Sequence, residues 1–179
     1  MLKIAGGKFR GRKLYLPDTD IVRATSNKVR EAVFNILKSR VVLDGVRVLD
    51  LFAGSGAIGI EAASWGAGFV EFVENDPAVL RVLEKNISEF ELGSVSRVTR
   101  GSKPHEEGFD IVFADPPYQD FEYDWPSLFP VVCPGGFFIF ESDKKEGLGE
   151  FVSGSELELV KNYKYGKTFI HLYEKQGTD

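Results

Sequence analysis

The chain has 179 residues, the usual length of one domain, and its 43% hydrophobic and 27% charged residues are typical of a soluble globular protein. Its longest apolar stretches, such as 137–140, have only the length of a strand, and its first residues lack the apolar run of a signal peptide. We therefore expect a cytoplasmic protein with no membrane partner. The single cysteine, Cys133, excludes an internal disulfide, and no zinc-site spacing can be assembled with only two histidines, so we expect no metal.

Charge is distributed unevenly along the chain. The net charge is −5, but residues 1–30 have a net charge of +6, which leaves −11 on the other 149 residues. A basic arm on an acidic body can meet phosphates while the body repels them elsewhere. A solvated surface hairpin would explain the same run of charge, so the charge pattern leaves both interpretations open. The basic residues of this stretch are Lys3, Lys8, Arg10, Arg12, Lys13, Arg23, Lys28 and Arg30.

Two elements are predicted before the main body of the chain. Glycines at turn or bulge positions and basic residues at alternating positions predict a β-hairpin over residues 4–16 with one basic face. Capping oxygens at 25–27, followed by apolar residues at helical spacing, predict a helix from Asn27 to Ser39. Arg30 is expected to lie off the apolar stripe of this helix.

From residue 46 onward, short apolar runs alternate with helical patterns, which is typical of a parallel sheet covered on both faces. The last two runs, on either side of Tyr165-Gly166, predict a closing antiparallel pair. We expect one α/β domain of Rossmann-like class, in which 45–179 form the core and 1–44 a basic hairpin and helix extension. The stretch 100–108 is too short for a helix and is predicted as a loop. Strands are predicted at 46–49, 69–73, 95–99, 109–114, 137–140, 157–160 and 168–173, and the core helices at 59–65 and 77–90.

A glycine loop follows the first of these strands directly and opens the next helix. Gly54, Gly56 and Gly59 match the G-x-G-x-x-G template that seats a pyrophosphate in dinucleotide-binding folds. Asp50 stands just ahead of them, and a carboxylate there would repel a pyrophosphate but attract a cationic ligand. S-adenosylmethionine has a sulfonium and an ammonium group, so the loop favours this cofactor over NAD. Glu74 ends the next strand, where its carboxylate could bind both ribose hydroxyls of either cofactor.

A second motif, Asp115-Pro116-Pro117-Tyr118, follows the fourth strand, at the sheet edge where ligands bind in open α/β folds. The two prolines fix the backbone, so that the Asp115 carboxylate and the carbonyl between the prolines point in set directions. Two acceptors that grip the hydrogens of an exocyclic amine would favour the pyramidal form whose lone pair can attack a methyl group. The Tyr118 ring could stack on an extruded base. A tight turn would explain the tetrapeptide by itself, but less well after the glycine loop and Glu74.

These motifs together resemble the RsmD family, bacterial methyltransferases that modify the N2 amino group of a guanine in 16S ribosomal RNA. The resemblance covers nearly the whole chain, in the segments 4–14, 23–37, 50–63, 115–118 and 165–168. The two N-terminal segments are the most specific, because the glycine loop and the tetrapeptide are shared with many amino-methyltransferases.

The resemblance implies a class I S-adenosylmethionine methyltransferase with a seven-stranded, mostly parallel sheet and an antiparallel last strand. It further implies that the protein acts, as a monomer, on 16S ribosomal RNA or on the small ribosomal subunit. The implied catalytic residues are Asp115, Pro116, Pro117 and Tyr118. The implied cofactor-binding residues are Asp50, Phe52, Ala53, Gly54, Gly56, Glu74, Asn75 and Ser102. The implied RNA-binding residues are Lys8, Arg10, Arg12, Lys13, Arg23 and Arg30.

The chain departs from the family pattern at three places. Ala24 replaces a usual Pro, Ser102 lies where the family offers an Asp to the adenine, and Ser142 follows Glu141 where the family often has His. Ser102 is the expected substitute for the missing Asp, and no role is expected for the pair at 141–142.

Other functions remain open from the sequence. DNA adenine-N6 methyltransferases use the same tetrapeptide but need a target-recognition region, for which this chain has no spare length. Protein-glutamine methylation is less favoured, because that chemistry usually resembles Asn-Pro-Pro-Tyr and residue 115 is Asp. A dinucleotide-binding oxidoreductase and a non-catalytic RNA-binding module are the alternatives from other classes.

Overall fold

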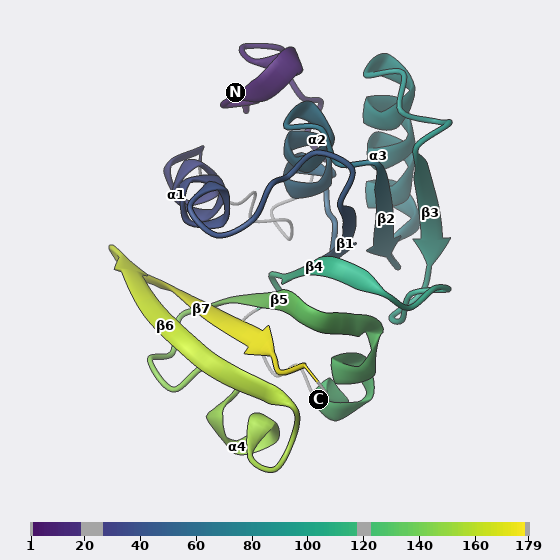
Figure 1. Cartoon of the computed structure of the whole chain (residues 1–179). Coiled ribbons are helices and arrows are strands. Elements are labelled where there is room, and N and C mark those ends of the chain that lie inside the picture. Colours follow the sequence, from purple (N-terminus) through teal and green to yellow (C-terminus); the bar gives the residue numbers. More distant parts are fainter. Residues whose placement is uncertain (1, 19–26, 118–122, 178–179) are drawn as a thin grey trace.

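The structure, a computed structural model, describes residues 2–18, 27–117 and 123–177 and contains a seven-stranded sheet with helices packed against it (Figure 1). The strand order is β3-β2-β1-β4-β5-β7-β6. Strands β1 to β5 pair in parallel, and β7 is antiparallel to both of its neighbours, β5 and β6. The predicted Rossmann-like α/β class, with a mostly parallel sheet and an antiparallel last strand, is confirmed.

Most elements lie close to their predicted positions. The strands are β1 (Arg47–Leu51), β2 (Phe69–Glu74), β3 (Ser96–Arg100), β4 (Phe109–Ala114), β5 (Val132–Ser142), β6 (Leu157–Tyr165) and β7 (Thr168–Lys175). The helices are α1 (Asn27–Lys38), α2 (Ala57–Ser64), α3 (Pro77–Glu89) and α4 (Gly149–Val152), and two 3-10 helices are η1 (Gly7–Phe9) and η2 (Trp125–Val131). The stretch 101–108 contains no helix, as predicted.

Apart from η1 in the N-terminal arm, two elements were not predicted. The 3-10 helix η2 contains prolines at 126 and 130, and proline disfavours a helix, so the sequence pattern did not predict it. The four residues of α4 are too few to show a helical period. Within the described ranges, no helix is long and apolar enough to cross a membrane.

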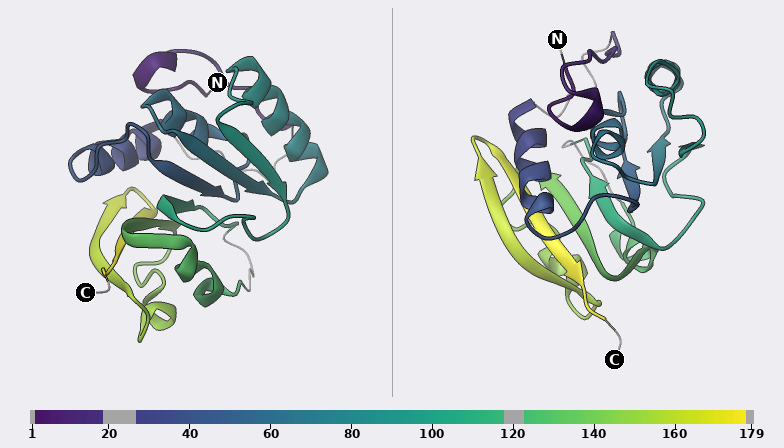
Figure 2. Two further views of the ribbon diagram at one scale, coloured as in Figure 1. Left: turned by 45° about the vertical axis from the view of Figure 1, so that its right-hand side comes forward. Right: turned by 45° about the horizontal axis from the view of Figure 1, so that its top comes forward.

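The two faces of the sheet are covered unequally. Helices α1, α2 and α3 lie on one face, whereas η2 and α4 lie on the other (Figures 1 and 2). Successive strand residues point to opposite faces, so Val48 packs in the core below the three helices and Leu49 in the core below η2. The predicted coverage of both faces is therefore present, but one cover consists of short segments.

The N-terminal arm, residues 2–14, folds back on itself without forming the regular hairpin that the alternating charges predicted. Lys3 and Lys13 form an isolated antiparallel bridge, and the Ile4 amide donates to the Arg12 carbonyl at 3.0 Å. The connection between the two halves is the 3-10 helix η1. The hairpin prediction was thus right about the pairing and wrong about regular strands.

The reason for the irregular arm is its close approach to the end of α2. A Cβ on Gly7, whose φ is +69°, would lie 2.0 Å from the Ser64 carbonyl oxygen, and a Cβ on Gly6 would lie 2.1 Å from the Trp65 ring. Only glycine fits there, so the contact with α2 rather than a β-turn fixes the path of the arm.

Candidate cofactor and acceptor site

Three adjacent strands, β2, β1 and β4, end at one edge of the sheet and bring three carboxylates there. β1 pairs with both neighbours up to Leu51. Glu74 and Asp115 come immediately after the residues that pair with Leu51, and Asp50 comes immediately before it. The strand order reverses between β1 and β4, which is the place where ligands bind in open α/β sheets.

The glycine loop that follows β1 has an unusual backbone. Phe52, Gly54 and Gly56 have φ values of +59°, +57° and +79°. The Gly56 amide donates to the Ala53 carbonyl at 2.7 Å, and a Cβ on Gly56 would lie 2.6 Å from the Leu83 side chain. The left-handed φ of Gly56 therefore favours glycine, and the Leu83 side chain leaves little room for a Cβ there.

Asp50 is a buried carboxylate in an acidic environment. Only 2% of it is exposed, and its Oδ2 accepts the Gly59 amide at 2.9 Å. Burial raises the pKa of Asp50 well above its ordinary value of 3.8, and repulsion from Asp115 and Glu74 adds to this rise, against the Gly59 hydrogen bond. A cation placed among these groups would relieve the repulsion, whereas a pyrophosphate would increase it. The donor set therefore fits S-adenosylmethionine better than NAD.

Glu74 is oriented by the backbone around it. Its Oε2 accepts the Gly54 amide at 3.0 Å, and its Oε1 accepts the amides of Asn75 and Asp76 at 2.8 and 3.0 Å. A carboxylate has about four acceptor positions, so one more hydroxyl can be accommodated. Asn75, predicted as a cofactor contact, is exposed next to this carboxylate.

The tetrapeptide begins at the end of β4. Asp115 is half-buried, Pro116 is buried and Pro117 is exposed. The charge of Asp115 contributes to the raised pKa of Asp50. The residue predicted to bind the target amine and the residue predicted to bind the cofactor therefore interact electrostatically. Tyr118 lies outside the described residues, as does Arg23 of the predicted RNA-binding set.

An aromatic cluster beside the glycine loop was missed by the sequence analysis. The ring of Phe52 lies 5.3 Å from that of Tyr123 and 6.2 Å from that of Trp125, and the latter two rings lie 4.9 Å apart. Burial, with a smaller contribution from Asp124, raises the pKa of Tyr123 to about 12. The signal in the sequence was the Tyr-x-Trp pair shortly after the tetrapeptide. Phe52, predicted as a cofactor contact, packs on these rings.

Ser102 is exposed in the loop after β3, near the end of β2. The Gly101 amide donates to the Glu74 carbonyl at 3.0 Å, and the His105 amide donates to the buried Glu71 carboxylate at 2.7 Å. Both ends of the loop are therefore tied to β2, and Ser102 lies between the two attachments.

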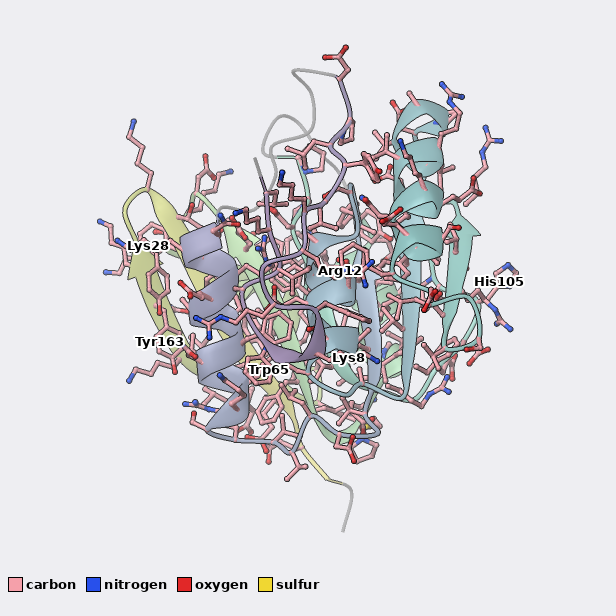
Figure 3. The ribbon with its side chains drawn as sticks, turned by 90° about the horizontal axis from the view of Figure 1, so that it is seen from above. Lys8, Arg12, Lys28, Trp65, His105 and Tyr163 are labelled. Carbon is pink, nitrogen blue, oxygen red and sulfur yellow. The ribbon has the colours of Figure 1, made fainter. Side chains whose placement is uncertain are left out.

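The basic residues of the N-terminal arm are largely presented to solvent. Lys8, Arg10 and Lys13 are exposed. The guanidinium of Arg12 lies 4.2 Å from the centre of the Phe90 ring, and its Nη2 donates to the Glu89 carbonyl at 2.6 Å. Figure 3 shows Lys8 and Arg12 on the same part of the surface as Trp65. Arg12 thus also attaches the arm to α3.

Arg30 is a correction, because the structure buries it completely. Its Nε donates to Glu61 of α2 at 3.1 Å, and its Nη2 bonds to the Lys3 carbonyl and, at 2.9 Å, to Asn27. The prediction that it lies off the apolar stripe and holds RNA phosphate was wrong. An arginine at this position of the helix faces α2, and the buried acid that it needs, Glu61, lies 31 residues away in the sequence.

The sheet order and the acidic glycine loop at its reversal point define a Rossmann-like methyltransferase fold. A family described as Conserved hypothetical protein 95 matches residues 2–174 of the chain. The protein belongs to this family, that of the RsmD methyltransferases.

Named relatives agree with this assignment. A Bacillus subtilis protein named putative rRNA methyltransferase YlbH is 32% identical over 98% of this chain and its own full length. The Escherichia coli protein named ribosomal RNA small subunit methyltransferase D is 40% identical over 66% of this chain and 61% of its own length. The solved structure of an Escherichia coli putative methyltransferase, yhhF, superposes with a TM-score of 0.80 at 28% identity and covers 98% of both chains.

Proposed function

We propose that the protein transfers a methyl group from S-adenosylmethionine to the exocyclic N2 of a guanine in 16S ribosomal RNA. The main support is the convergence of Asp50, Glu74 and Asp115 at one sheet edge. Such an acidic set suits a cationic cofactor and an amino group with hydrogens to donate. The names of the relatives, which refer to ribosomal RNA and the small subunit, support the RNA target.

Each part of the site would have a separate task. When bound, S-adenosylmethionine supplies an electrophilic methyl group on a sulfonium. Asp50 and the glycine loop would hold its methionine end, and Glu74 its ribose. The Asp115 carboxylate and the Pro116 carbonyl would accept hydrogen bonds from the two amino hydrogens and turn the nitrogen lone pair toward the methyl group. The methylated nitrogen would be cationic and would release one proton to solvent, so no strong base is required.

The N-terminal arm supports a nucleic-acid substrate. Lys8, Arg10 and Lys13 extend from a segment whose backbone is fixed on α2, because Glu61 accepts the amides of Ala5 and Gly6 at 2.8 and 2.7 Å. Cations on a rigid support can meet phosphates with little loss of conformational entropy. We propose that a monomer acts in the cytoplasm, where ribosomal particles are assembled.

A methyl-transfer assay tests the proposal. Small ribosomal subunits from cells that lack the gene are incubated with the protein and labelled S-adenosylmethionine, and the digested RNA is analysed by mass spectrometry. We expect N2-methylguanine at one position, and we expect Asp115→Asn to abolish its formation. A parallel sample with duplex DNA tests the leading alternative, DNA adenine-N6 methylation. Label found in N6-methyladenine of that DNA, and not in the ribosomal RNA, would reject the proposed target.

A non-catalytic RNA-binding role is tested by the same variant in cells. If a strain with Asp115→Ala kept every effect of the wild-type gene, methyl transfer would not be the function of the protein. Binding of NAD in preference to S-adenosylmethionine, measured by calorimetry, would instead favour an oxidoreductase.

A further inference from the structure

A groove of about 480 Å³ lies between α1 and the edge strand β6, apart from the site described above. From α1 and the residues after it, Lys28, Glu31 and Arg40 line the groove, and from β6 Tyr163 and Tyr165 line it. Figure 3 shows Lys28 and Tyr163 on one flank of the molecule, beside this helix and this strand. Neither the cofactor loop nor the tetrapeptide uses these residues.

The two tyrosines form a row because they are two residues apart on one strand. Strand residues at this spacing share a face, and Tyr163 and Tyr165 pack on the core below α1 while remaining partly exposed. The Lys161 ammonium lies 5.2 Å from the centre of the Tyr163 ring, and the Arg40 guanidinium donates to the Tyr163 hydroxyl at 3.1 Å. The Tyr163 side chain is thus in contact with two cations.

One end of the groove-lining strand β6 lies at the same edge of the sheet as the candidate site. β5 and β6 are both antiparallel to β7, so β6 runs parallel to β5 and the other central strands. Its carboxyl end, at Tyr165, therefore lies at the same edge as Asp50 and Asp115. Lys28, at the start of α1, lines the groove together with Tyr165.

The charge of this region differs from that of the rest of the body. Residues 31–179 have a net charge of −11, yet the segment 161–167 contains three lysines and no acidic residue. Glu31 is the acidic residue among the groove-lining residues, against the two cations Lys28 and Arg40. Aromatic rings beside basic side chains are typical of surfaces that bind single-stranded nucleic acid, where bases stack and phosphates meet cations.

We propose that this groove binds an unpaired strand of the RNA substrate adjacent to the target guanine, with bases stacked on Tyr163 and Tyr165 and phosphates on Lys28 and Lys161. The inference rests on the proposed RNA target. A second copy of the chain fits less well, because a two-fold contact would bring two patches of the same net positive charge against each other. The lysines along the edge strand also oppose pairing with another strand.

Fluorescence anisotropy without cofactor tests the groove. The probe is a fluorescein-labelled single-stranded RNA of about a dozen nucleotides, compared with a blunt RNA duplex. We expect Tyr165→Ala to weaken binding of the single strand at least about 5-fold and Tyr165→Phe to keep it, because stacking needs the ring and not the hydroxyl. Lys28→Ala with Lys161→Ala should make the slope of log affinity against log salt shallower by about 1.4. Lys145→Ala, an exposed lysine elsewhere, is the matched control and should change nothing.

Each result has a definite meaning. If the groove variants bind the single strand as tightly as Lys145→Ala does, or if the wild type binds no RNA, the groove proposal is overturned. If light scattering shows a dimer that Tyr165→Ala dissociates, the occupant is a second copy and the RNA groove is again rejected. The methyl-transfer assay on ribosomal subunits judges the proposed function separately, so an active enzyme with an unimportant groove would be recognised.

Discussion

Two buried carboxylates, Glu61 on α2 and Asp50 on β1, lie in opposite electrostatic environments. Only 1% of Glu61 and 2% of Asp50 is exposed. Glu61 accepts the Arg30 guanidinium and two backbone amides, whereas Asp50 accepts one amide and is surrounded by other carboxylates. The comparison indicates that the charge of Glu61, which has a structural role, is neutralised within the fold. The charge of Asp50, which we propose binds the cofactor, stays uncompensated until a cation binds.

The largest expected effect comes from breaking the compensated pair. Arg30→Met removes the cation and leaves Glu61 buried with only amide donors. Loss of one partner of a buried ion pair costs about 3–5 kcal/mol. We expect the free energy of unfolding, measured in urea, to fall by about that amount, and the N-terminal arm to detach from α2, seen as faster amide exchange at Ala5 and Gly6.

A double variant is the control for this prediction. Arg30→Met with Glu61→Gln removes both charges and keeps an amide oxygen that can accept an arm amide. We expect it to recover part of the lost stability, because the uncompensated buried charge is gone. Equal losses in the single and double variants would contradict the view that the uncompensated charge is the cause.

The second expected effect has the opposite sign. Asp50→Asn keeps an acceptor for the Gly59 amide but removes a buried charge that Glu74 and Asp115 repel. We expect the melting temperature of the ligand-free protein to rise by at least about 2 °C. The affinity for S-adenosylmethionine, measured by calorimetry, should fall about 10-fold or more, the value of a charge-assisted hydrogen bond.

The matched control for Asp50→Asn is Asp143→Asn, an exposed carboxylate after β5, which should alter neither quantity. If Asp50→Asn lowered the melting temperature, Asp50 would be a structural group like Glu61 and the contrast between the two would disappear.

Local patterns were enough to predict most of the fold. Apolar runs such as 109–114 predict strands that are buried on both faces. Asp76 followed by Pro77 indicates the start of α3, and the Asp76 carboxylate accepts two backbone amides there. The sequence analysis also placed Asp50, Glu74 and Asp115 at the ends of predicted strands, and parallel strands have their carboxyl ends at one edge of the sheet.

The failures were of a different kind. Whether Arg30 meets RNA or Glu61 depends on a contact between distant segments, for which one sequence provides no period or spacing. The same holds for Gly6, whose neighbour is Trp65, and for the cluster of Phe52 with Tyr123. Side-chain partners formed by tertiary packing override local propensity.

The third prediction concerns pH. A carboxyl whose pKa is raised in the folded state binds more protons folded than unfolded, so Asp50 makes the protein less stable as pH rises from about 4 toward its raised pKa. Melting curves of wild type and Asp50→Asn should therefore differ little near pH 4 and diverge above it, with the variant more stable. A constant difference at all pH values would mean that the effect comes from packing rather than from ionisation.

The smallest effect is expected at two partly exposed ion pairs, which Glu106 forms with Arg47 and, at 2.5 Å, with Arg97. The hydrogen bond from Arg47 is the main reason that the pKa of Glu106 is lowered, so this group stabilises the fold above its ordinary pKa and loses that contribution as pH falls. The sign is thus opposite to that of Asp50. Because the pair is screened by water and salt, Glu106→Gln should lower the melting temperature by about 1 °C or less, and by nothing measurable in about 1 M salt. If Glu106→Gln lowered the stability as much as Arg30→Met does, ion pairing rather than burial would determine how much a carboxylate contributes to the stability of this protein.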